Sequence, residues 1–318
     1  MLHLRLIVPG DLRRAVLDAL DDCIGVAHVI TLPGTARRPP GDVVLCDVAR
    51  ESADELLGRL RELGLAEQGA IDVSLLELSI SAAAREAERE APGTRSDALV
   101  WESVTKVTHE ESAFSYTYLA FIVTATMLAA CGVVLDSSVL IVGAMVVGPE
   151  FGPLAGFCVA LVQRRSHPAL RSLTALLGGF ALAIALTILF ARMMDAFGLF
   201  TEAEFDGPRP NTSFIFQPDA LSLVVAFLGG VAGLLSLTSA KSGALVGVAI
   251  SVTTVPAAAN VAVALAYGDF GQARGSSVQL LLNMSGIVIA GVLTLLVQQS
   301  AWRQLRERRH AARRQRGA

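Results

Sequence analysis

One carboxylic acid is placed where it could do chemistry, because it lies in the middle of a long apolar segment. Glu150 follows Pro149, and the residues from Val139 to Leu161 contain no other charged side chain. An ionised carboxylate in hydrocarbon is costly, so Glu150 must be protonated, paired or hydrated there. Two interpretations follow: Glu150 is a proton- or cation-binding group of a central cavity, or it caps a half-helix that begins after Pro149.

Helix-breaking residues surround this acid and recur in a second apolar segment. Proline removes a backbone donor and clashes with the preceding turn, so each segment should kink or unwind. Backbone groups freed in lipid must be buried in protein or line a watery cavity; a simple proline kink stabilised by neighbouring helices is the alternative. Two asparagines could instead hydrogen-bond across helices. The candidate cavity or transport residues are Gly148, Pro149, Glu150, Gly152, Pro153, Thr253, Thr254, Pro256, Asn260 and Asn283.

The motifs of common enzyme classes are missing from the sequence. It contains no P-loop, GxGxxG, HExxH or nucleophile elbow, and its four cysteines form no CxxC pair. The histidines His109 and His167 fall in polar segments rather than at membrane depth. We therefore expect no enzyme, no cofactor and no metal site.

The composition predicts a membrane protein. The chain of 318 residues is 53% hydrophobic and 17% charged, with a mean hydropathy of +0.55. Charged residues of both signs are abundant before Glu111 and nearly missing from 114–299. The tail after residue 303 is basic. About 20 helical residues cross the hydrocarbon layer. We predict six spans, at 116–135, 138–162, 172–194, 219–238, 242–267 and 276–299.

The connecting charges predict the orientation in the cell (inner) membrane. Arg164, Arg165 and Arg171 lie between spans two and three, Lys241 lies between spans four and five, and the tail is rich in arginine. Cytoplasmic loops collect Lys and Arg, so both termini should be cytoplasmic. No removable signal peptide is visible at the first residues. Since topology and anionic lipid explain the basic tail, we expect no nucleic-acid partner.

The first 80 residues predict a separate soluble domain in an α+β chain. Alternating and amphipathic patterns give strands at 2–8, 26–32, 42–48 and 70–80, and helices at 11–22 and 53–63, with a loop at 33–41. The order βαββαβ is that of a ferredoxin-like sandwich. The predicted domains are a cytosolic ferredoxin-like domain at 1–80, a charged linker and juxtamembrane helix at 81–113, a six-helix membrane domain at 114–300 and a basic cytoplasmic tail at 301–318.

An internal repeat relates the two halves of the membrane region. A shift of 242 − 138 = 104 residues places Ser138–Gly143 on Ser242–Gly247 and superposes the starts of the remaining spans. Three spans that start inside and three that start outside run in opposite senses. The sequence therefore predicts a 3+3 inverted repeat, which is typical of secondary transporters whose site lies between broken helices near the midplane.

Several motifs resemble a known prokaryotic membrane family over roughly residues 100–300. The family is catalogued as domain of unknown function 389, an uncharacterised hydrophobic domain, so the resemblance implies a membrane domain and transfers no catalytic residue. Many members have an apolar residue after the first proline and a second proline after the one matching Pro256; Glu150 and Ala257 depart from this, so a function of Glu150 would belong to a subgroup. The matching motifs are Asp136-Ser137-Ser138, Val142-Gly143-Ala144-Met145, Gly148-Pro149, Gly152-Pro153, Arg209-Pro210-Asn211, Gly243-Ala244-Leu245-Val246-Gly247-Val248-Ala249-Ile250 and Val255-Pro256.

Two functions fit these patterns. The first is a transporter or channel for a small solute or ion, with a cytosolic regulatory domain and a path between spans two and five. The alternative is a membrane-anchored small-molecule sensor or regulatory protein, in which Arg37 and Arg38 of the loop at 33–41 contact an anionic ligand and the bundle serves signalling or assembly. The expected partners are the lipid bilayer and an unknown small solute or ion, and assembly with further copies of the same chain is left open.

Overall fold

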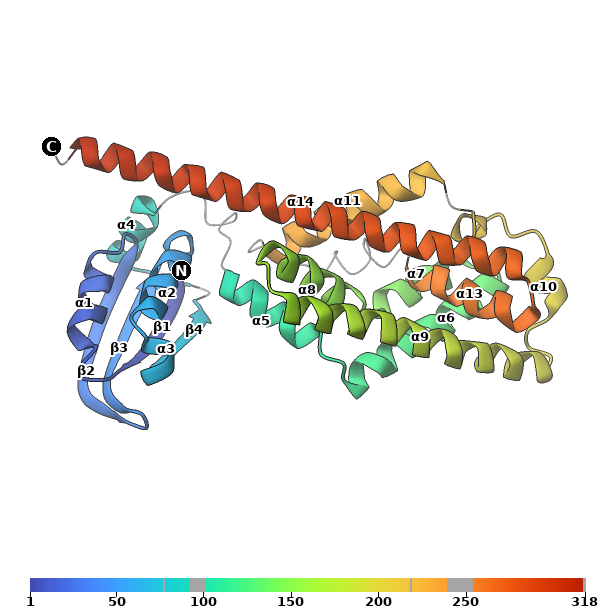
Figure 1. Ribbon diagram of the computed structural model, residues 1–318, viewed down its shortest axis with the longest axis horizontal. Helices are drawn as coiled ribbons and strands as arrows, with labels where there is room; N and C mark the ends of the chain where they lie inside the picture. Colours follow the sequence, from blue (N-terminus) through green and yellow to red (C-terminus); the bar gives the residue numbers. More distant parts are fainter. Residues whose placement is uncertain (77, 92–100, 218, 239–253, 317–318) are drawn as a thin grey trace. The chain divides into compact units, whose positions relative to one another are not determined.

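The computed structural model describes residues 1–76, 78–91, 101–217, 219–238 and 254–316, and the chain divides into two compact units. The first unit is built on the residues up to Ser103, together with short segments from later in the chain. The second unit contains the described residues of Val104–Leu237 and Ser242–Val297. Each unit is described by itself (Figure 1).

The first unit contains a four-stranded antiparallel sheet. The strands lie in the order β2-β3-β1-β4. In the register, Leu4 of β1 lies opposite Cys46 of β3 on one side and Val73 of β4 on the other. The strands are β1 Leu2–Val8, β2 Val26–Arg37, β3 Pro40–Val48 and β4 Ala70–Leu75.

Two helices cover one face of this sheet because alternate residues of its central strands are apolar. Every second residue of β1, from Leu2 to Val8, is buried against the helices, as are alternate residues of β3. The small helix α4 packs its buried alanines Ala84 and Ala87 near Met1 and Ala27 instead. The helices of this unit are α1 Arg13–Asp21, α2 Arg50–Glu62, α3 Leu65–Gln68 and α4 Ala82–Glu90.

Two sequence predictions for this unit are wrong in their boundaries. The predicted loop at 33–41 is instead a long hairpin, since β2 continues to Arg37, which pairs with Pro40. The register shifts between Leu32 and Ala36, so the Pro-Gly pair at 33–34 forms an irregularity within the strand rather than its end. The last strand ends at Leu75, not at residue 80, because β1 begins opposite it at Leu2 and offers no partner further along.

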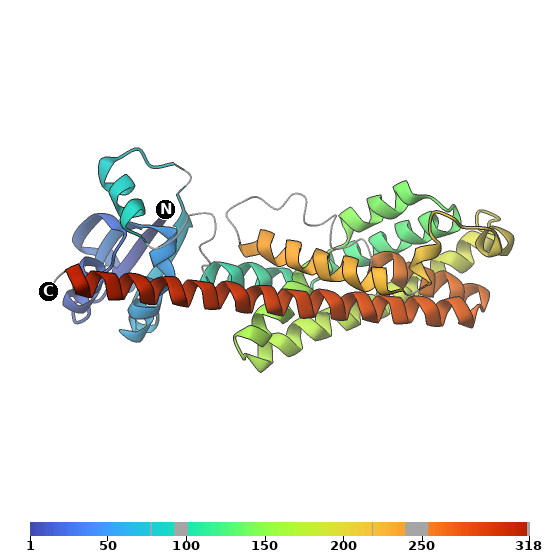
Figure 2. The ribbon, with the colours of Figure 1, turned by 90° about the horizontal axis from the view of Figure 1, so that it is seen from above.

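The second unit is helical. Helix α5 begins in the first unit and continues into the second, and α14 leaves the second unit after Val297. Helix α9 runs from the end near α8, whereas α14 runs in the opposite direction beside it (Figures 1 and 2). The elements are α5 Trp101–Glu111, α6 Tyr116–Val134, α7 Ser138–Val147, α8 Phe151–Val162, α9 Ser166–Ala196, α10 Glu202–Asp206, η1 Ser213–Ile215, α11 Ala220–Thr238, α13 Val255–Tyr267 and α14 Phe270–Arg316.

Four of these helices are long and apolar enough to cross a membrane, or five spans result if the bent pair α7–α8 counts as one. The four are α6, α9, α11 and the part of α14 from Phe270 to Ala301. Six spans were expected. Helix α13 has only 13 residues, about 20 Å at 1.5 Å per residue, and the first half of the predicted fifth span, with Lys241, lies outside the described residues.

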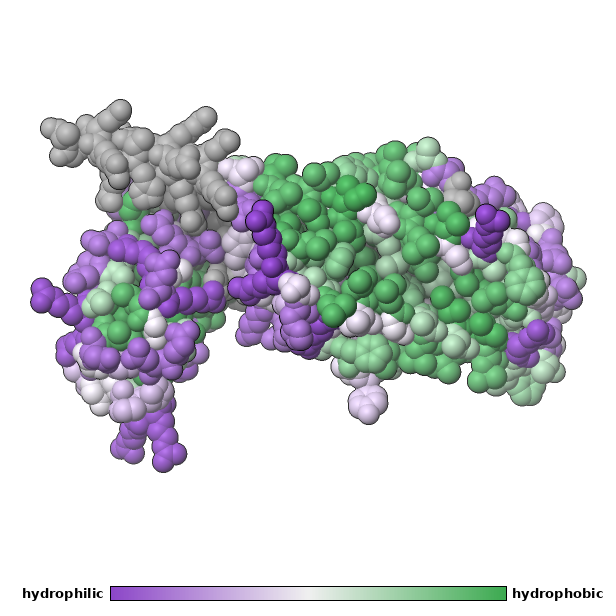
Figure 3. Space-filling model, in the orientation of Figure 1, coloured by the Kyte–Doolittle hydropathy of each residue, from purple (hydrophilic) through white to green (hydrophobic). Residues whose placement is uncertain are grey.

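The outer surface of the helical unit is as apolar as its interior. Large apolar side chains such as Val139, Leu189 and Leu228 are more than half exposed. Figure 3 shows this hydrophobic surface over the sides of the helices. The interior instead contains small residues, among them the fully buried Ala257, Ala258 and Ala262 of α13. A surface of this kind fits lipid rather than water, so the helices form a membrane domain.

Three pairs of helices in this unit start at the same distance along the chain. The starts of α6 and α11 are 220 − 116 = 104 residues apart. The same offset separates α8 from α13, at Phe151 and Val255, and α9 from α14, at Ser166 and Phe270. Helices α6 and α11 each contain 19 residues. The offset found in the sequence therefore recurs in the helix boundaries.

Candidate functional site

The second predicted span, at 138–162, is broken at the predicted place around Glu150. Helix α7 ends at Val147, α8 begins at Phe151, and the two are bent by 54°. Gly148 is extended, with φ −65° and ψ 129°, which ends the first helix. Gly152 and Pro153 lie in the first turn of α8, where a proline costs no intrahelical hydrogen bond. The break therefore separates two short half-helices inside the membrane domain.

Gly148 allows three segments to approach each other closely. A Cβ atom at this position would collide with Oε2 of Glu150 and would lie 3.0 Å from Cγ2 of Val255. A side chain at Gly148 would therefore force Glu150 and Val255 to shift. The absence of a side chain at Gly148 thus brings the end of α7, the acid and the start of α13 together.

Glu150 is fully buried beside the start of α13. Its Oε1 accepts a hydrogen bond of 2.9 Å from Oγ1 of Thr254. Its Oε2 has no hydrogen-bond partner among the described residues. The side chain accepts no hydrogen bond from the first turn of α8, so the capping interpretation is wrong. The acid reaches across to another helix and leaves one oxygen available, which is unusual for a buried carboxyl group.

The donor to Glu150 occupies the corresponding position of the other half of the sequence. Thr254 lies directly before α13, as Glu150 lies directly before α8, and the two are 104 residues apart. Pro256 is the second residue of α13. Thr253, the remaining candidate of this segment, lies outside the described residues. The structure therefore joins the two predicted breaker segments through one hydrogen bond.

A buried polar stripe on α14 contains the candidate Asn283 and the hydrogen-bond partner of the candidate Asn260. Gln272, Ser276, Gln279 and Asn283 follow each other at helical spacing, and the last three are almost fully buried. Asn260 of α13 donates to Oγ of Ser276 at 2.7 Å, and Nε2 of Gln279 donates to Oδ1 of Asn283 at 3.3 Å. Oε1 of Gln279 has no partner in the described part of the chain. The asparagines thus hydrogen-bond to this stripe rather than to Glu150.

The sequence reasoning missed Arg209 as a site residue. Its guanidinium group donates to Oδ1 of Asn260 at 3.1 Å and also to Oε1 of Gln272. It lies over the rings of Phe205 and Phe216, 4.3 and 4.8 Å from their centroids. Burial lowers the pKa of Arg209, with nearby aspartates opposing the shift. The sequence feature that could have indicated Arg209 is the motif Arg209-Pro210-Asn211, which the resemblance to the family already includes.

A second family motif meets the segment that contains Arg209. Asp136 lies between α6 and α7 with a left-handed φ of 46°. It accepts hydrogen bonds from Nδ2 of Asn211 at 2.9 Å and from Oγ1 of Thr212 at 2.8 Å. Although desolvation opposes ionisation, these hydrogen bonds lower the pKa of Asp136. We call Asp136, Arg209, Asn211, Thr212 and Asn260 the loop network, and Gly148, Glu150 and Thr254 the helix-break site.

The described residues include no group of three or more His, Cys, Asp or Glu side chains that could hold a metal ion. The cysteines within this part of the chain are free thiols. Among the described residues, the groups of the helix-break site are one carboxyl group, one hydroxyl group and the backbone around them.

This arrangement defines a membrane domain with a buried carboxyl group at a helix break, and comparison with known proteins agrees with the predicted resemblance. Residues 145–289 match the family described as "Domain of unknown function (DUF389)". The matched segment includes the break, α13 and most of the polar stripe.

One relative extends the match beyond that domain. The chain is 23% identical over 208 residues to "Uncharacterized protein MJ0678" of Methanocaldococcus jannaschii. The alignment covers 65% of this chain and 61% of the relative. No solved structure matches the chain.

Proposed function

We propose that the helical unit moves a small solute or ion across a membrane, with Glu150 as a group that exchanges a proton or binds a cation. The observation that carries this proposal is the fully buried carboxyl group at a helix break, which has a single hydrogen-bond donor among the described residues. A carboxyl group that only stabilised the fold would be expected to satisfy both oxygens. Intramembrane acids of this kind are typical of proton and ion pathways.

The free oxygen gives Glu150 two stable forms. In the protonated form, Oε2 carries the proton and Oε1 still accepts from Thr254, so the side chain is neutral in its dry surroundings. In the ionised form, Oε2 needs water, a cation or a donor from the solute. Passage of a hydrated solute along the break would thus change the protonation of Glu150, which couples the two fluxes.

An inverted repeat of three plus three spans is part of the proposal. It is supported by the common offset of 104 residues between three pairs of helix starts and by the opposite directions of α9 and α14. The hydrogen bond between Glu150 and Thr254 joins corresponding positions. In such transporters the two broken helices lie together at the repeat interface. In this arrangement residues 242–267 form the fifth of six spans and both termini are cytoplasmic.

The first unit serves as a cytosolic regulatory domain in this proposal. We infer a ferredoxin-like sandwich, which is supported by the antiparallel strand order β2-β3-β1-β4 and by α1 and α2 on one face. The chain has no catalytic role in the proposal. Small sandwiches of this kind often bind ligands or dimerise, but that is an argument from the fold alone.

Flux measurements on the full chain test the proposal. The protein is reconstituted in liposomes containing a pH-sensitive dye, and gradients of a panel of ions and small solutes are imposed. We expect at least one solute to drive proton movement, and we expect Glu150→Gln to reduce this coupled movement at least tenfold. Glu150→Asp keeps the acid and serves as the matched control, with folding of each variant checked by gel filtration.

Two results would count against the proposal. Coupled flux that is equal in the wild type and in Glu150→Gln removes the acid from the mechanism. Failure of every solute to move, together with binding of a small molecule by the full chain that depends on the first unit, would favour the sensor.

A further inference from the structure

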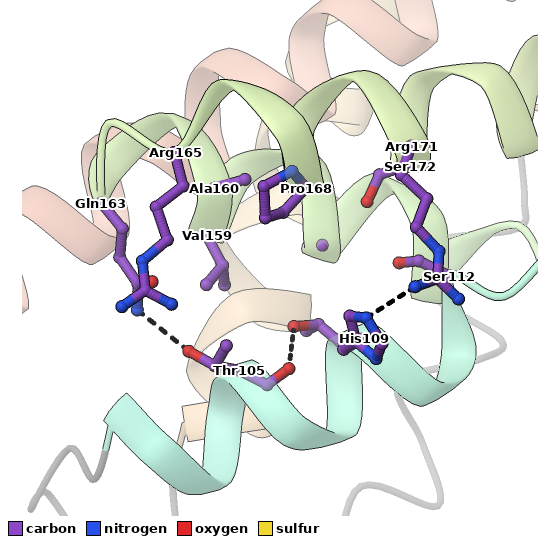
Figure 4. Close-up of a pocket in the computed structure, with 12 residues that line it drawn as sticks. Thr105, His109, Ser112, Val159, Ala160, Gln163, Arg165, Pro168, Arg171 and Ser172 are labelled. Atoms are coloured by element: carbon purple, nitrogen blue, oxygen red, sulfur yellow. Dashed lines mark hydrogen bonds between the residues drawn. The ribbon is translucent and has the colours of Figure 1, made fainter. Parts of the chain in front are cut away.

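A cavity of about 110 Å³ lies within the helical unit, away from the helix-break site. It is enclosed by α5, the last turns of α8 and the first turns of α9 (Figure 4). The middle of its wall is apolar, whereas polar side chains gather at its ends. Its lining consists of Thr105, Thr108, His109, Ser112, Gly156, Val159, Ala160, Gln163, Arg165, Pro168, Arg171 and Ser172.

The cavity is positively charged. Two arginines line it, Arg165 near Gln163 at one end and Arg171 near His109 at the other (Figure 4). No aspartate or glutamate lines it, and neither arginine forms a salt bridge within the described part of the chain. The acids Glu110 and Glu111 belong to the end of α5 but do not line the cavity. Two uncompensated guanidinium groups favour an anionic ligand.

His109 adds no negative charge to this cavity. Nη1 of Arg171 lies 2.6 Å from Nε2 of His109. Because a guanidinium group only donates, Nε2 must accept, so the ring is neutral in this arrangement. The histidine thus orients Arg171 toward the cavity mouth without neutralising it.

A buried hydroxyl group faces the same space without a partner. Ser172 is 3% exposed and forms no hydrogen bond to any other described residue, although it lines the cavity. Ser112 is similarly buried but donates to the carbonyl oxygen of Gly152 at 3.3 Å. The hydroxyl group of Ser172 is thus available to a ligand or to water in the cavity.

Glycine keeps the space beside this hydroxyl group open. A Cβ atom at Gly156 would collide with Oγ of Ser112 and would lie 2.9 Å from Oγ of Ser172. Helices α5, α8 and α9 therefore approach each other closely here, and the two serine hydroxyl groups lie near each other at the end that contains Arg171 (Figure 4). A ligand in the cavity would meet both of them.

We propose that this cavity binds a phosphate group, which Arg165 and Arg171 approach from the two ends and Ser172 contacts beside Arg171. One water needs about 10–15 Å³ on this measure, so the cavity has room for a phosphate group. The phosphate group can belong to free phosphate or to the headgroup of a phospholipid whose apolar part follows Val159 and Pro168. Arginine is suited to both because its planar fork matches phosphate oxygens.

Binding to the full chain in phosphate-free detergent tests the site in two arms. Inorganic phosphate is titrated in the first arm, and water-soluble dihexanoyl phosphatidylglycerol in the second, each followed by the shift in unfolding temperature. We expect the variant Arg165→Gln with Arg171→Gln to weaken binding at least tenfold. Ser172→Ala should weaken it by a smaller factor.

The matched control removes the same charge elsewhere. Arg164 and Arg192 do not line the cavity, so the variant Arg164→Gln with Arg192→Gln should bind as the wild type does. Binding in the first arm identifies free phosphate as a ligand, and binding in the second arm alone identifies the phospholipid. Binding in neither arm, or equal weakening by both double variants, overturns the proposal. These results do not depend on whether the protein transports a solute.

Discussion

The helix-break site and the loop network both bury polar groups in the same membrane domain, yet they treat their carboxyl groups differently. Asp136 in the loop network receives hydrogen bonds from Asn211 and Thr212 on both of its oxygens. Glu150 in the helix-break site receives one hydrogen bond, although it is the more deeply buried of the two. The acid in the drier place therefore has fewer donors, which is the reverse of what stability alone would favour.

In the proposed function, this difference separates a structural acid from one that exchanges a proton or binds a cation. Asp136 is held as an anion by its donors and ties the α6–α7 connection to residues near η1. Arg209 completes the loop network through amide oxygens and aromatic rings. Glu150 retains one oxygen for a proton or another ligand. Substitutions in the two regions should accordingly differ in what they damage, and the following predictions are ordered by the size of the expected effect.

The largest loss of stability is expected for Arg209→Ala. The substitution removes the hydrogen bonds to Asn260 and Gln272 and leaves a hole between Phe205 and Phe216. We expect a loss of roughly 3 kcal/mol, the usual scale for removing one member of a buried charged network. Thermal unfolding in detergent measures it, with Arg209→Lys as a control that keeps the charge but loses the planar fork. Unchanged unfolding would mean that the loop network contributes little to the fold.

A smaller loss is expected for Asp136→Ala, about 1–2 kcal/mol, because Asp136 is partly exposed and its donors can turn to water. Its pKa is lowered in the folded protein, so its contribution is present above the unfolded value near 3.9 and is lost as the pH falls through the folded value. The wild type and the variant should therefore converge in unfolding temperature below about pH 3.9. A gap that persists in acid would assign the effect to backbone strain at this left-handed position.

Glu150→Gln should leave stability unchanged or raise it slightly. The amide fills the same volume, can accept from Thr254 and, like the protonated acid, is neutral in this buried place. The comparison is sharpest when this variant and Asp136→Ala are unfolded under the same conditions. A loss for Glu150→Gln as large as that for Asp136→Ala would make Glu150 a structural residue and would erase the distinction between the two regions.

Outside this comparison, a modest effect is expected in the first unit, where Asp47 is a buried carboxyl group with two partners. Its oxygens lie 2.7 Å from Nδ1 of His3 and 2.7 Å from Nδ1 of His28. Desolvation opposes ionisation, but these two partners lower the pKa of Asp47. Asp47→Asn should therefore raise hydrogen exchange of β1 and β3 at pH 6 by a few-fold, less so as the pH falls below about 3.9. Equal exchange in both proteins at pH 6 would contradict this.

Much of this fold follows from the sequence because periodicity and breakers are local properties. The alternation from Leu2 to Val8 and the Gly-Pro pairs around Glu150 placed a strand and a helix break correctly. The hairpin of β2 and β3 was missed because Pro33-Gly34 normally ends a strand, and only the pairing with β3 shows that it does not.

The candidate residues could be singled out from the sequence, but their contacts could not. Glu150, Thr254 and the two asparagines were identified because polar groups in apolar helices are rare. Their hydrogen-bond partners depend on the packing of helices about 100 residues apart in the sequence. Local sequence patterns do not predict this packing. Arg209 was overlooked because it belongs to a loop, and only the fold turns its side chain toward Asn260.

The single bond between Glu150 and Thr254 has a mechanical consequence. If the two halves exchange conformations during transport, corresponding residues exchange their environments. A contact between two corresponding residues then lies close to the part of the domain that moves least. The carboxyl group would then stay near the axis of the movement. It would lose and regain its proton as water reaches it from alternate sides of the membrane. A single carboxyl group near the middle of the membrane domain, instead of one such group in each half, would then serve both directions of transport.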